Sequence, residues 1–185
     1  MQTFRSLVVI FVFALTACAG AQPIATTVPA TASPMPLTWM SVELTDASTG
    51  KTFMINDFKG KVVLVDSMAI WCPNCLRQGL NLKSLRSMYS PDDLVLVTLD
   101  IDSHEDAAML ADYAKQGGFE WRFAVAPLEL QRNVGNVYGA LFLDPTLSPT
   151  LIVDRSGEVY KMGFGEKKAE AMRTSLAPLI AAGSK

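Results

Sequence analysis

Two closely spaced cysteines, Cys72 and Cys75, are the residues of this chain best suited to covalent chemistry. They follow an apolar, β-branched run over 62–67 and precede a helical pattern that starts at about Leu76, so the sequence predicts a strand that delivers both thiols to the first turn of a helix. Unpaired backbone N–H groups and the positive end of the helix dipole favour the thiolate of Cys72, which is the reactive form. Cys75 lies one helical turn further on the same side, where it can form a disulfide with Cys72. Pro73 suits the first helical positions, because its missing N–H group removes no hydrogen bond there.

A Cys-x-x-Cys pair can also bind a metal ion or form a purely structural disulfide. A zinc site needs about four ligands, whereas the rest of the chain supplies only Cys18 and one histidine, His104. A structural disulfide gains nothing from a helix-start position that directly follows Trp71. The context therefore favours redox-active cysteines and leaves the structural disulfide and the metal site as alternatives.

An aspartate, Asp66, lies within the apolar run that precedes the cysteines. A carboxylate in an apolar strand is costly unless it is protonated, hydrated or functional. Asp66 is therefore a candidate functional residue. The alternative is an aspartate at the end of the strand that is exposed to water.

The elements that must position these residues alternate between strands and helices, which predicts a three-layer α/β sheet in one domain over 37–185. The first expected elements are a hairpin of strands over 39–44 and 51–54, a buried strand over 62–67 and a helix to about 89. A buried strand over 94–99, a helix over 105–116 capped by Ser103 and Asp106, and a strand over 121–125 should follow. The last expected elements are a helix over 128–138, a hairpin of strands over 149–154 and 159–162, and a helix over 166–181.

Composition limits the classes of function. Half of the 185 residues are hydrophobic (50%), enough for a full core, and the net charge is −2 without a basic tract. This pattern gives no indication of a nucleic-acid partner. His104, Lys161, Lys167 and Lys168 are expected at the solvated surface.

The N-terminus has the pattern of an export signal. Residues 1–17 carry one positive charge before a short apolar run, which is too short to span a bilayer but suits a signal peptide. Leu15-Thr16-Ala17-Cys18 resembles the lipobox of bacterial lipoproteins, which implies that Cys18 is lipidated; an ordinary secretory signal is the alternative. Residues 18–36 are uncharged and rich in Ala, Thr and Pro, so they are predicted to be a disordered tether. Export would place the cysteine pair where disulfides persist.

The segment Val65-Asp66 to Trp71-Cys72-x-x-Cys75 resembles the active-site strand and turn of thioredoxin-fold proteins. The layout of residues 37–182 is similar to that of the membrane-tethered TlpA/ResA-type thiol–disulfide oxidoreductases. The resemblance implies a thioredoxin fold with three α/β/α layers, a central mixed sheet and an N-terminal β-hairpin extension. It also implies that Asp66 takes the proton of the resolving Cys75. TlpA/ResA-type proteins more often have a glutamate at the position of Gln78, which cannot exchange a proton.

A second part of the resemblance concerns substrate contacts. Pro149 matches the cis-proline of the fold and would face the cysteines, so that the backbone of Ser148 would be free to pair with an extended substrate; a trans proline that opens a strand is the alternative. Trp71 and Pro73 complete the expected substrate-binding set, with a packed core tryptophan as the alternative for Trp71. The apolar segment 141–147 is either an exposed loop that grips the substrate or part of the core.

The leading hypothesis is a lipid-anchored, extracytoplasmic thiol–disulfide oxidoreductase without a cofactor. It would exchange disulfides with exported proteins, more as a reductant than as an oxidant, and a membrane electron donor would recharge it. A copper-handling protein of the Sco kind is an alternative, although Sco proteins have a wider cysteine spacing and a downstream histidine. A peroxiredoxin is another alternative, but its Thr-x-x-Cys pattern is missing because Ala69 stands at the threonine position.

Overall fold

The computed structural model describes residues 38–182 of the chain. The predicted signal peptide (1–17), Cys18 and the tether to residue 36 lie outside the described residues. Within the described part of the chain, no helix is long and apolar enough to cross a membrane.

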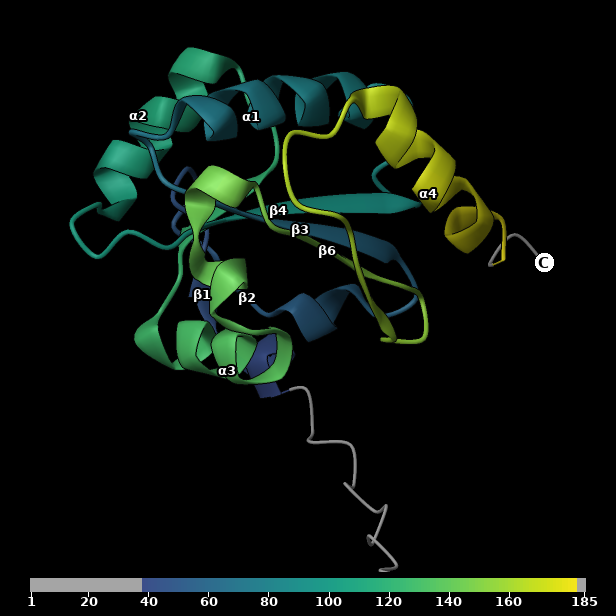
Figure 1. Ribbon diagram of the computed structural model, residues 1–185, viewed down its shortest axis with the longest axis horizontal. Helices are drawn as coiled ribbons and strands as arrows, with labels where there is room; N and C mark the ends of the chain where they lie inside the picture. The colour runs from purple at the N-terminus through teal and green to yellow at the C-terminus, as the bar shows by residue number, and fades with distance from the viewer. Residues whose placement is uncertain (1–37, 183–185) are drawn as a thin grey trace, which may run out of the picture. The chain divides into compact units, whose positions relative to one another are not determined.

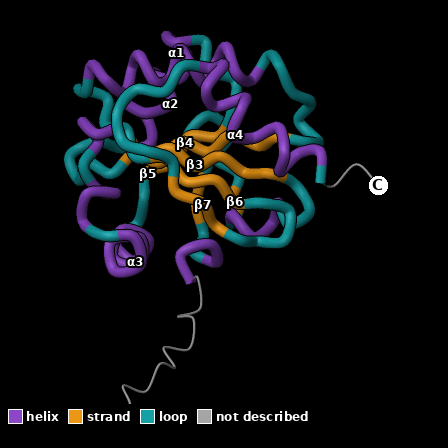
Figure 2. Tube along the Cα trace, turned by 45° about the vertical axis from the view of Figure 1, so that its right-hand side comes forward, coloured by secondary structure: helices purple, strands orange, loops and turns teal. Residues whose placement is uncertain are grey.

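A five-stranded mixed sheet with the strand order β5-β4-β3-β6-β7 forms the centre of the domain (Figure 1, Figure 2). The central strand β3 pairs in parallel with β4 and antiparallel with β6, as expected for the mixed sheet of a thioredoxin fold. The strands are β3 (Val62–Met68), β4 (Leu94–Asp100), β5 (Arg122–Val125), β6 (Thr150–Val153) and β7 (Val159–Lys161).

Helices cover both faces of this sheet. Figure 1 shows α1 (Pro73–Arg86), α2 (Ala107–Gly117) and α4 (Ala169–Ala181) on one side, and α3 (Leu128–Tyr138) on the other. The face that carries α3 also packs against a 3₁₀ helix, η1 (Thr38–Ser41), and a small hairpin of β1 (Leu44–Thr45) and β2 (Thr52–Phe53). The predicted three-layer architecture with an N-terminal hairpin is confirmed.

Alternation along β3 decides which side chains face which layer, because successive residues of a strand point to opposite faces. Val63 and Val65 pack into the core beneath α3, whereas Val62 and Leu64 pack into the core beneath α1 and α4. Asp66 shares the parity of Val62 and Leu64, so the strand directs its carboxyl into the layer of α1, the helix that carries the cysteines.

Several predicted boundaries are wrong. The segment from Trp39 begins with a 3₁₀ helix rather than a strand, because the fully buried Trp39 ring packs against Tyr138 and donates a 3.1 Å hydrogen bond from Nε1 to its hydroxyl. Helix α2 begins after Asp106, whose side chain accepts a 2.9 Å hydrogen bond from the Met109 N–H group, so Ser103 does not cap it. Helix α4 begins at Ala169, three residues later than predicted, with Lys168 as its N-cap residue.

Candidate active site

The two cysteines occupy the start of α1, as predicted. Cys72 is the N-cap residue, Pro73 opens the helix, and the Cys75 N–H group donates to Cys72 Sγ at 3.3 Å. Both thiols are unpaired and almost fully buried, with 1% of Cys72 and 3% of Cys75 exposed. The first turn of α1 therefore presents a backbone donor to the Cys72 sulfur, which the Cys72 carbonyl shares at 3.1 Å; such a donor at a helix N-terminus favours negative charge on the acceptor.

A short turn lies over the thiols. The segment 140–147 forms two 3₁₀ helices, η3 (Ala140–Leu143) and η4 (Pro145–Leu147), and the Pro145 carbonyl accepts from Cys75 Sγ at 3.1 Å and from Cys72 Sγ at 3.6 Å. Asn74 fastens this turn to α1, because its side-chain amide donates to the Thr146 carbonyl at 2.8 Å. The turn is the reason that the cysteines are covered.

The segment 141–147 is partly core and partly exposed, and whether it grips a substrate stays a prediction. Phe142 belongs to the core, whereas the neighbouring Leu141 is 56% exposed. One side of the segment therefore packs inward while the other faces solvent.

Asp66 is buried and hydrogen-bonded. It is 2% exposed, and the Thr150 hydroxyl donates to its Oδ1 at 2.9 Å. Burial raises the pKa of Asp66 to about 7, against the opposing effects of the Thr150 hydrogen bond and the Lys167 charge. The alternative of a water-exposed aspartate is wrong.

Asp66 and Cys75 line the same small cavity, which is otherwise bounded by residues of β3, β4, α1, α2 and β5. Burial, together with the neighbouring Cys72 thiol, raises the pKa of the Cys75 thiol above its usual range. A buried thiol of this kind needs a nearby base to become a nucleophile. Asp66 is the carboxyl group that shares this cavity with Cys75.

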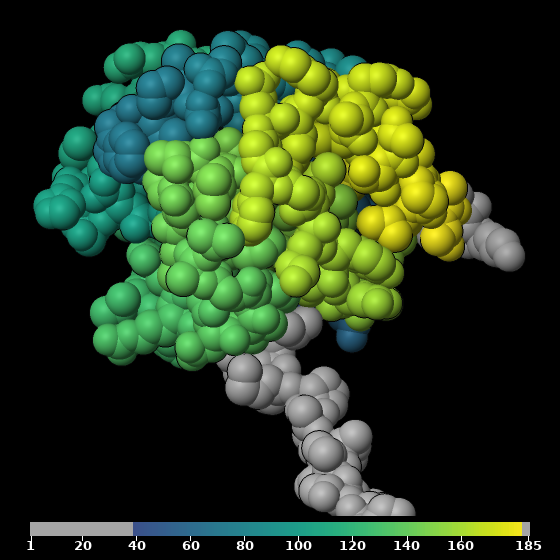
Figure 3. Space-filling model, viewed as in Figure 1, coloured from purple at the N-terminus to yellow at the C-terminus, as the bar shows by residue number. Residues whose placement is uncertain are grey.

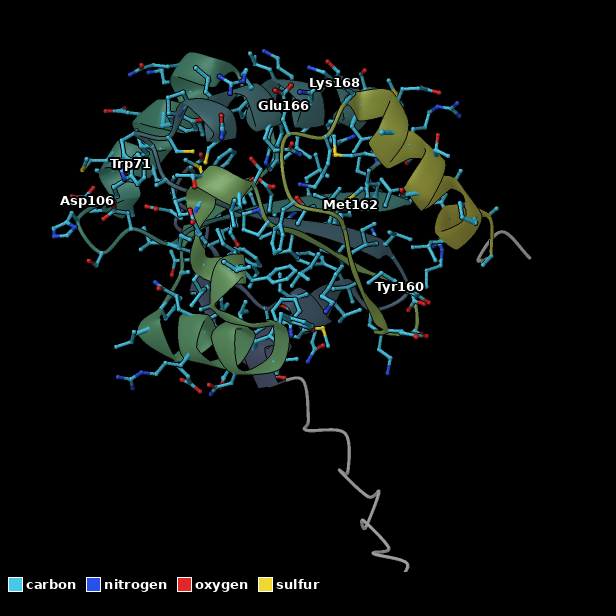
Figure 4. The ribbon with its side chains drawn as sticks, in the orientation of Figure 1. Trp71, Asp106, Tyr160, Met162, Glu166 and Lys168 are labelled. Carbon is cyan, nitrogen blue, oxygen red and sulfur yellow. The ribbon has the colours of Figure 1, made fainter. Side chains whose placement is uncertain are left out.

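Trp71 flanks the cysteines at the surface and is 57% exposed (Figure 4). Its indole Nε1 donates to Asp102 Oδ2 at 2.6 Å, so the ring is held beside the active-site turn rather than packed in the core. Hydrogen bonds from the His104 backbone and from Trp71 lower the pKa of Asp102 to about 2. The side chain of His104 is 91% exposed, as predicted.

The Glu105 carboxylate also holds the active-site turn in place. The Ile70 N–H group donates to both carboxyl oxygens of Glu105, at 2.8 and 3.0 Å. Nearby, burial and the neighbouring Glu105 charge raise the pKa of Asp100 to about 7, against a backbone hydrogen bond from Asp102. Glu105 itself lies before α2, which Asp106 caps.

The expectation of a cis bond before Pro149 is wrong, because the Ser148–Pro149 bond is trans. Ser148 instead turns the chain by adopting the left-handed conformation, with φ 46° and ψ 56°. Its backbone is also not free: the N–H group donates to Pro145 O at 3.0 Å, and the carbonyl accepts from Lys167 Nζ. Contact of Ser148, Pro149, Trp71 and Pro73 with a substrate stays a prediction.

The expectation of a surface position for Lys167 is wrong, because its side chain is buried. Only 8% of Lys167 is exposed, whereas Lys161 and Lys168 are exposed as predicted. The fully buried side chain of Gln78 accepts from the Lys167 N–H group at 2.8 Å and donates to Met172 Sδ at 3.5 Å. Gln78 thus joins α1 to the segment before α4, which is a structural role that needs no proton exchange.

Four residues of the site were not predicted from the sequence: Thr150, Pro145, Glu105 and Lys167. Thr150 carries a usable signal, because it is the polar residue that opens an apolar strand immediately after Pro149. The other three have no local signal, since the chain contains many prolines, glutamates and lysines of similar context. Among residues 38–182, no group of three or more His, Cys, Asp or Glu side chains is arranged to hold a metal ion.

Comparison with known proteins places this site in a family. The Redoxin family model matches residues 25–179, which is most of the chain, and the chain belongs to the Redoxin family. It is 27% identical over 127 residues to the thiol–disulfide oxidoreductase ResA of Bacillus thuringiensis subsp. konkukian (strain 97-27), with 69% of this chain and 68% of the relative covered. ResA of Bacillus anthracis is 26% identical over 123 residues, with 66% of each chain covered. Together with the Cys-x-x-Cys helix start, these relatives identify a thiol–disulfide oxidoreductase of the ResA type.

Solved structures show the same thioredoxin-like fold. A putative electron transfer protein from Aquifex aeolicus VF5 has a TM-score of 0.61 at 16% identity and covers 76% of this chain and 94% of its own. A thiol-disulfide isomerase from Corynebacterium glutamicum has a TM-score of 0.59 at 18% identity, with 76% and 95% covered. A SCO1/SenC family lipoprotein from Bacillus anthracis str. Ames has a TM-score of 0.58 at 17% identity, with 75% and 92% covered. At these identities the likeness concerns the fold alone.

Proposed function

We propose that this protein reduces disulfides of exported proteins with Cys72 as the nucleophile and Cys75 as the resolving thiol. The observation that carries the proposal is the placement of Cys72 Sγ at the start of α1, where it accepts a 3.3 Å hydrogen bond from the Cys75 N–H group. A sulfur in this position gains stabilisation as a thiolate and as a leaving group.

The reaction proceeds in two exchanges. The Cys72 thiolate attacks one sulfur of a substrate disulfide, a Cys72–substrate disulfide forms, and the other substrate sulfur leaves as a thiolate that takes up a proton. The Cys75 thiolate then attacks Cys72 Sγ, and the second substrate sulfur leaves in the same way. The substrate gains two electrons and two protons, and the enzyme is left with a Cys72–Cys75 disulfide.

Asp66 takes the proton from Cys75 before the second exchange. Its carboxyl lines the same cavity as Cys75, and its pKa of about 7 lets it accept a proton near neutral pH and release it afterwards. The transfer runs across this cavity, directly or through one water molecule.

The oxidised enzyme needs a donor that returns two electrons, and we assign this role to a dithiol of a membrane protein. The assignment agrees with the lipobox-like sequence around Cys18, which would anchor the protein at the extracytoplasmic face of a membrane. The ResA-type relatives support the thiol–disulfide chemistry but do not decide its direction.

Turnover with a fluorescently labelled disulfide protein and a small dithiol as electron source tests the proposal. Cys72→Ser should reduce turnover to the uncatalysed rate, because the remaining Cys75 thiol does not occupy the N-cap position of α1 that favours the attacking thiolate. Cys18→Ser is the matched control and should keep full turnover of the purified protein. Full turnover by Cys72→Ser contradicts the proposal. Titration with Cu(I) addresses the copper-binding alternative, which predicts a tight site that Cys72→Ser removes.

A further inference from the structure

Lys167 is a buried cation beside the site that the proposed reaction does not use. Its ammonium group donates to the carbonyls of Ser148 at 2.5 Å and of Gly165 at 2.7 Å. Burying an ammonium group is costly unless it is well satisfied or has a function. Within residues 38–182, no carboxylate lies in ion-pair contact with it, so an ordinary surface pair does not explain its position.

Side chains of α1 hold Lys167 and its neighbour Glu166 in place by hydrogen bonds. The Gln78 side chain accepts from the Lys167 N–H group at 2.8 Å. The preceding residue, Glu166, accepts from Arg77 at 3.2 Å and from Asn81 at 2.9 Å, and Figure 4 shows Glu166 and Lys168 beside α1 at the start of α4. The helix that carries the cysteines thus also sets the place of the buried ammonium group.

Hydrogen bonds connect this ammonium group to Asp66. The Thr150 hydroxyl lies 2.9 Å from Asp66 Oδ1 and 3.2 Å from the Ser148 carbonyl, which is the carbonyl that Lys167 holds. A hydroxyl has one proton to donate. When Asp66 is ionised, its carboxylate accepts a hydrogen bond from the Thr150 hydroxyl. When Asp66 is protonated, it donates a hydrogen bond to the Thr150 oxygen, and the hydroxyl can then donate to the Ser148 carbonyl. Lys167 keeps the Ser148 carbonyl hydrogen-bonded in both states.

The same carbonyl belongs to the strained turn above the cysteines. The left-handed conformation is strained for a non-glycine residue, and Ser148 adopts it with φ 46°. Its neighbour Leu147 accepts from the Gly165 N–H group at 2.7 Å. Figure 3 shows the segments that carry these residues, light green and yellow, packed side by side on one face. The Lys167 segment therefore holds the turn that covers the thiols.

We propose that Lys167 is a positioning residue of the oxidoreductase, which holds the Ser148 carbonyl in place beside the Thr150 hydroxyl that bonds to Asp66. This inference rests on the role of Asp66 in the proposed function. The other titratable groups that act on or are affected by Asp66 are Cys75 of α1 and Tyr113 of α2, and both become negative on ionisation. Lys167 is the cation that opposes them: its charge lowers the pKa of Asp66, and Asp66 in turn raises the pKa of Lys167 against the effect of burial.

Titration of the Asp66 carboxyl by infrared difference spectroscopy tests this inference without turnover. The Asp66 band is the one that Asp66→Asn removes. Lys167→Met and Lys167→Gln should raise its midpoint by about one pH unit, the lower end of the effect of a neighbouring opposite charge. Lys167→Arg should restore the midpoint towards that of the native protein. Lys168→Met is the matched control, because it removes an exposed lysine from the adjacent position, and it should leave the midpoint unchanged.

An unchanged midpoint in a folded Lys167→Met or Lys167→Gln variant overturns the role of Lys167, whether or not the variant turns over. The pH dependence of turnover then separates the two proposals. A midpoint that shifts together with the rate profile supports both of them. A midpoint that shifts while the rate profile stays in place confirms the Lys167–Asp66 coupling and contradicts the assignment of Asp66 as the base.

Discussion

Thr150 stands directly opposite Asp66 in the antiparallel β3–β6 pair, and its hydroxyl donates a 2.9 Å hydrogen bond to the Asp66 carboxyl. The pairing register therefore places a neutral donor next to the buried acid. A hydrogen bond to the ionised form lowers a carboxyl pKa. Thr150 and burial thus act in opposite directions, and their balance leaves the Asp66 pKa near neutral.

Replacing the Thr150 hydroxyl should change the pKa of Asp66. Thr150→Val keeps the shape of the side chain but removes the donor, so the Asp66 pKa should rise above about 7. The rising limb of the pH–rate profile for disulfide reduction should move to higher pH with it. Thr98→Val is a suitable control, because Thr98 flanks Asp66 on the β4 side and accepts from Trp121 instead. An identical profile for Thr150→Val and the native protein would contradict the proposed base.

Asp66 should also make the folded state less stable as the pH rises. Its folded-state pKa of about 7 lies above the ordinary value of 3.8, so between these values the native protein holds a proton that the unfolded chain has lost. Stability attributable to Asp66 is complete below about pH 4 and is lost as the pH rises to about 7, by roughly 4 kcal/mol in all. Urea unfolding of the native protein and of Asp66→Asn at several pH values measures the difference. We expect the asparagine variant to be relatively more stable at pH 8 than at pH 4; parallel curves would show that Asp66 is not a shifted acid.

Substitution of each cysteine should distinguish the role of Cys75 as the resolving thiol from the role of Cys72 as the nucleophile. Cys75→Ser leaves Cys72 able to form the first mixed disulfide but removes the thiol that releases it. Mass spectrometry should therefore find the variant covalently attached to a disulfide substrate, while the native protein releases its product. Cys72→Ser should form no such adduct. An adduct on Cys75 in the Cys72→Ser variant would mean that the roles are reversed.

The turn over the thiols should control access to Cys72. Asn74→Ala removes the hydrogen bond to the Thr146 carbonyl that fastens η4 to α1, so the Cys72 thiol should be uncovered more often. The alkylation rate of Cys72 by iodoacetamide should increase several-fold. Asn56→Ala serves as the control, because Asn56 bonds to Ser41 and lies outside the site. An equal alkylation rate in both variants would mean that η4 does not limit access.

Local patterns predicted the part of the site that lies within one strand–helix unit. Asp66, Trp71, Cys72 and Cys75 lie on β3, at the start of α1 or between them, so the apolar run and the Cys-Pro-Asn-Cys spacing determine their relation. The central sheet and its helices were predicted in the same way, because apolar residues are spaced as in strands and as in helices in alternating segments of the chain. The substrate contacts implied by the family resemblance had no such local basis.

The rest of the site depends on contacts between distant parts of the chain. Lys167 resembles its exposed neighbour Lys168 in sequence, and only its docking on Gln78 and Ser148 distinguishes it. The trans bond before Pro149 occurs together with a left-handed Ser148, which hydrogen bonds to Pro145 and Lys167. Propensity at residues 148–149 cannot reveal a partner that comes from the segment before α4.

The reduction potential of the Cys72–Cys75 pair tests the central claim most directly. The protein would be equilibrated in thiol–disulfide buffers of defined ratio, and the free Cys72 and Cys75 thiols would be quantified after acid quenching. We expect one reversible two-electron couple near −270 mV, about the value of thioredoxin, as for an enzyme that reduces its substrates. A couple near −120 mV, about the value of a strong oxidant, would contradict the direction of electron flow. The absence of any reversible couple would contradict the thiol–disulfide function itself.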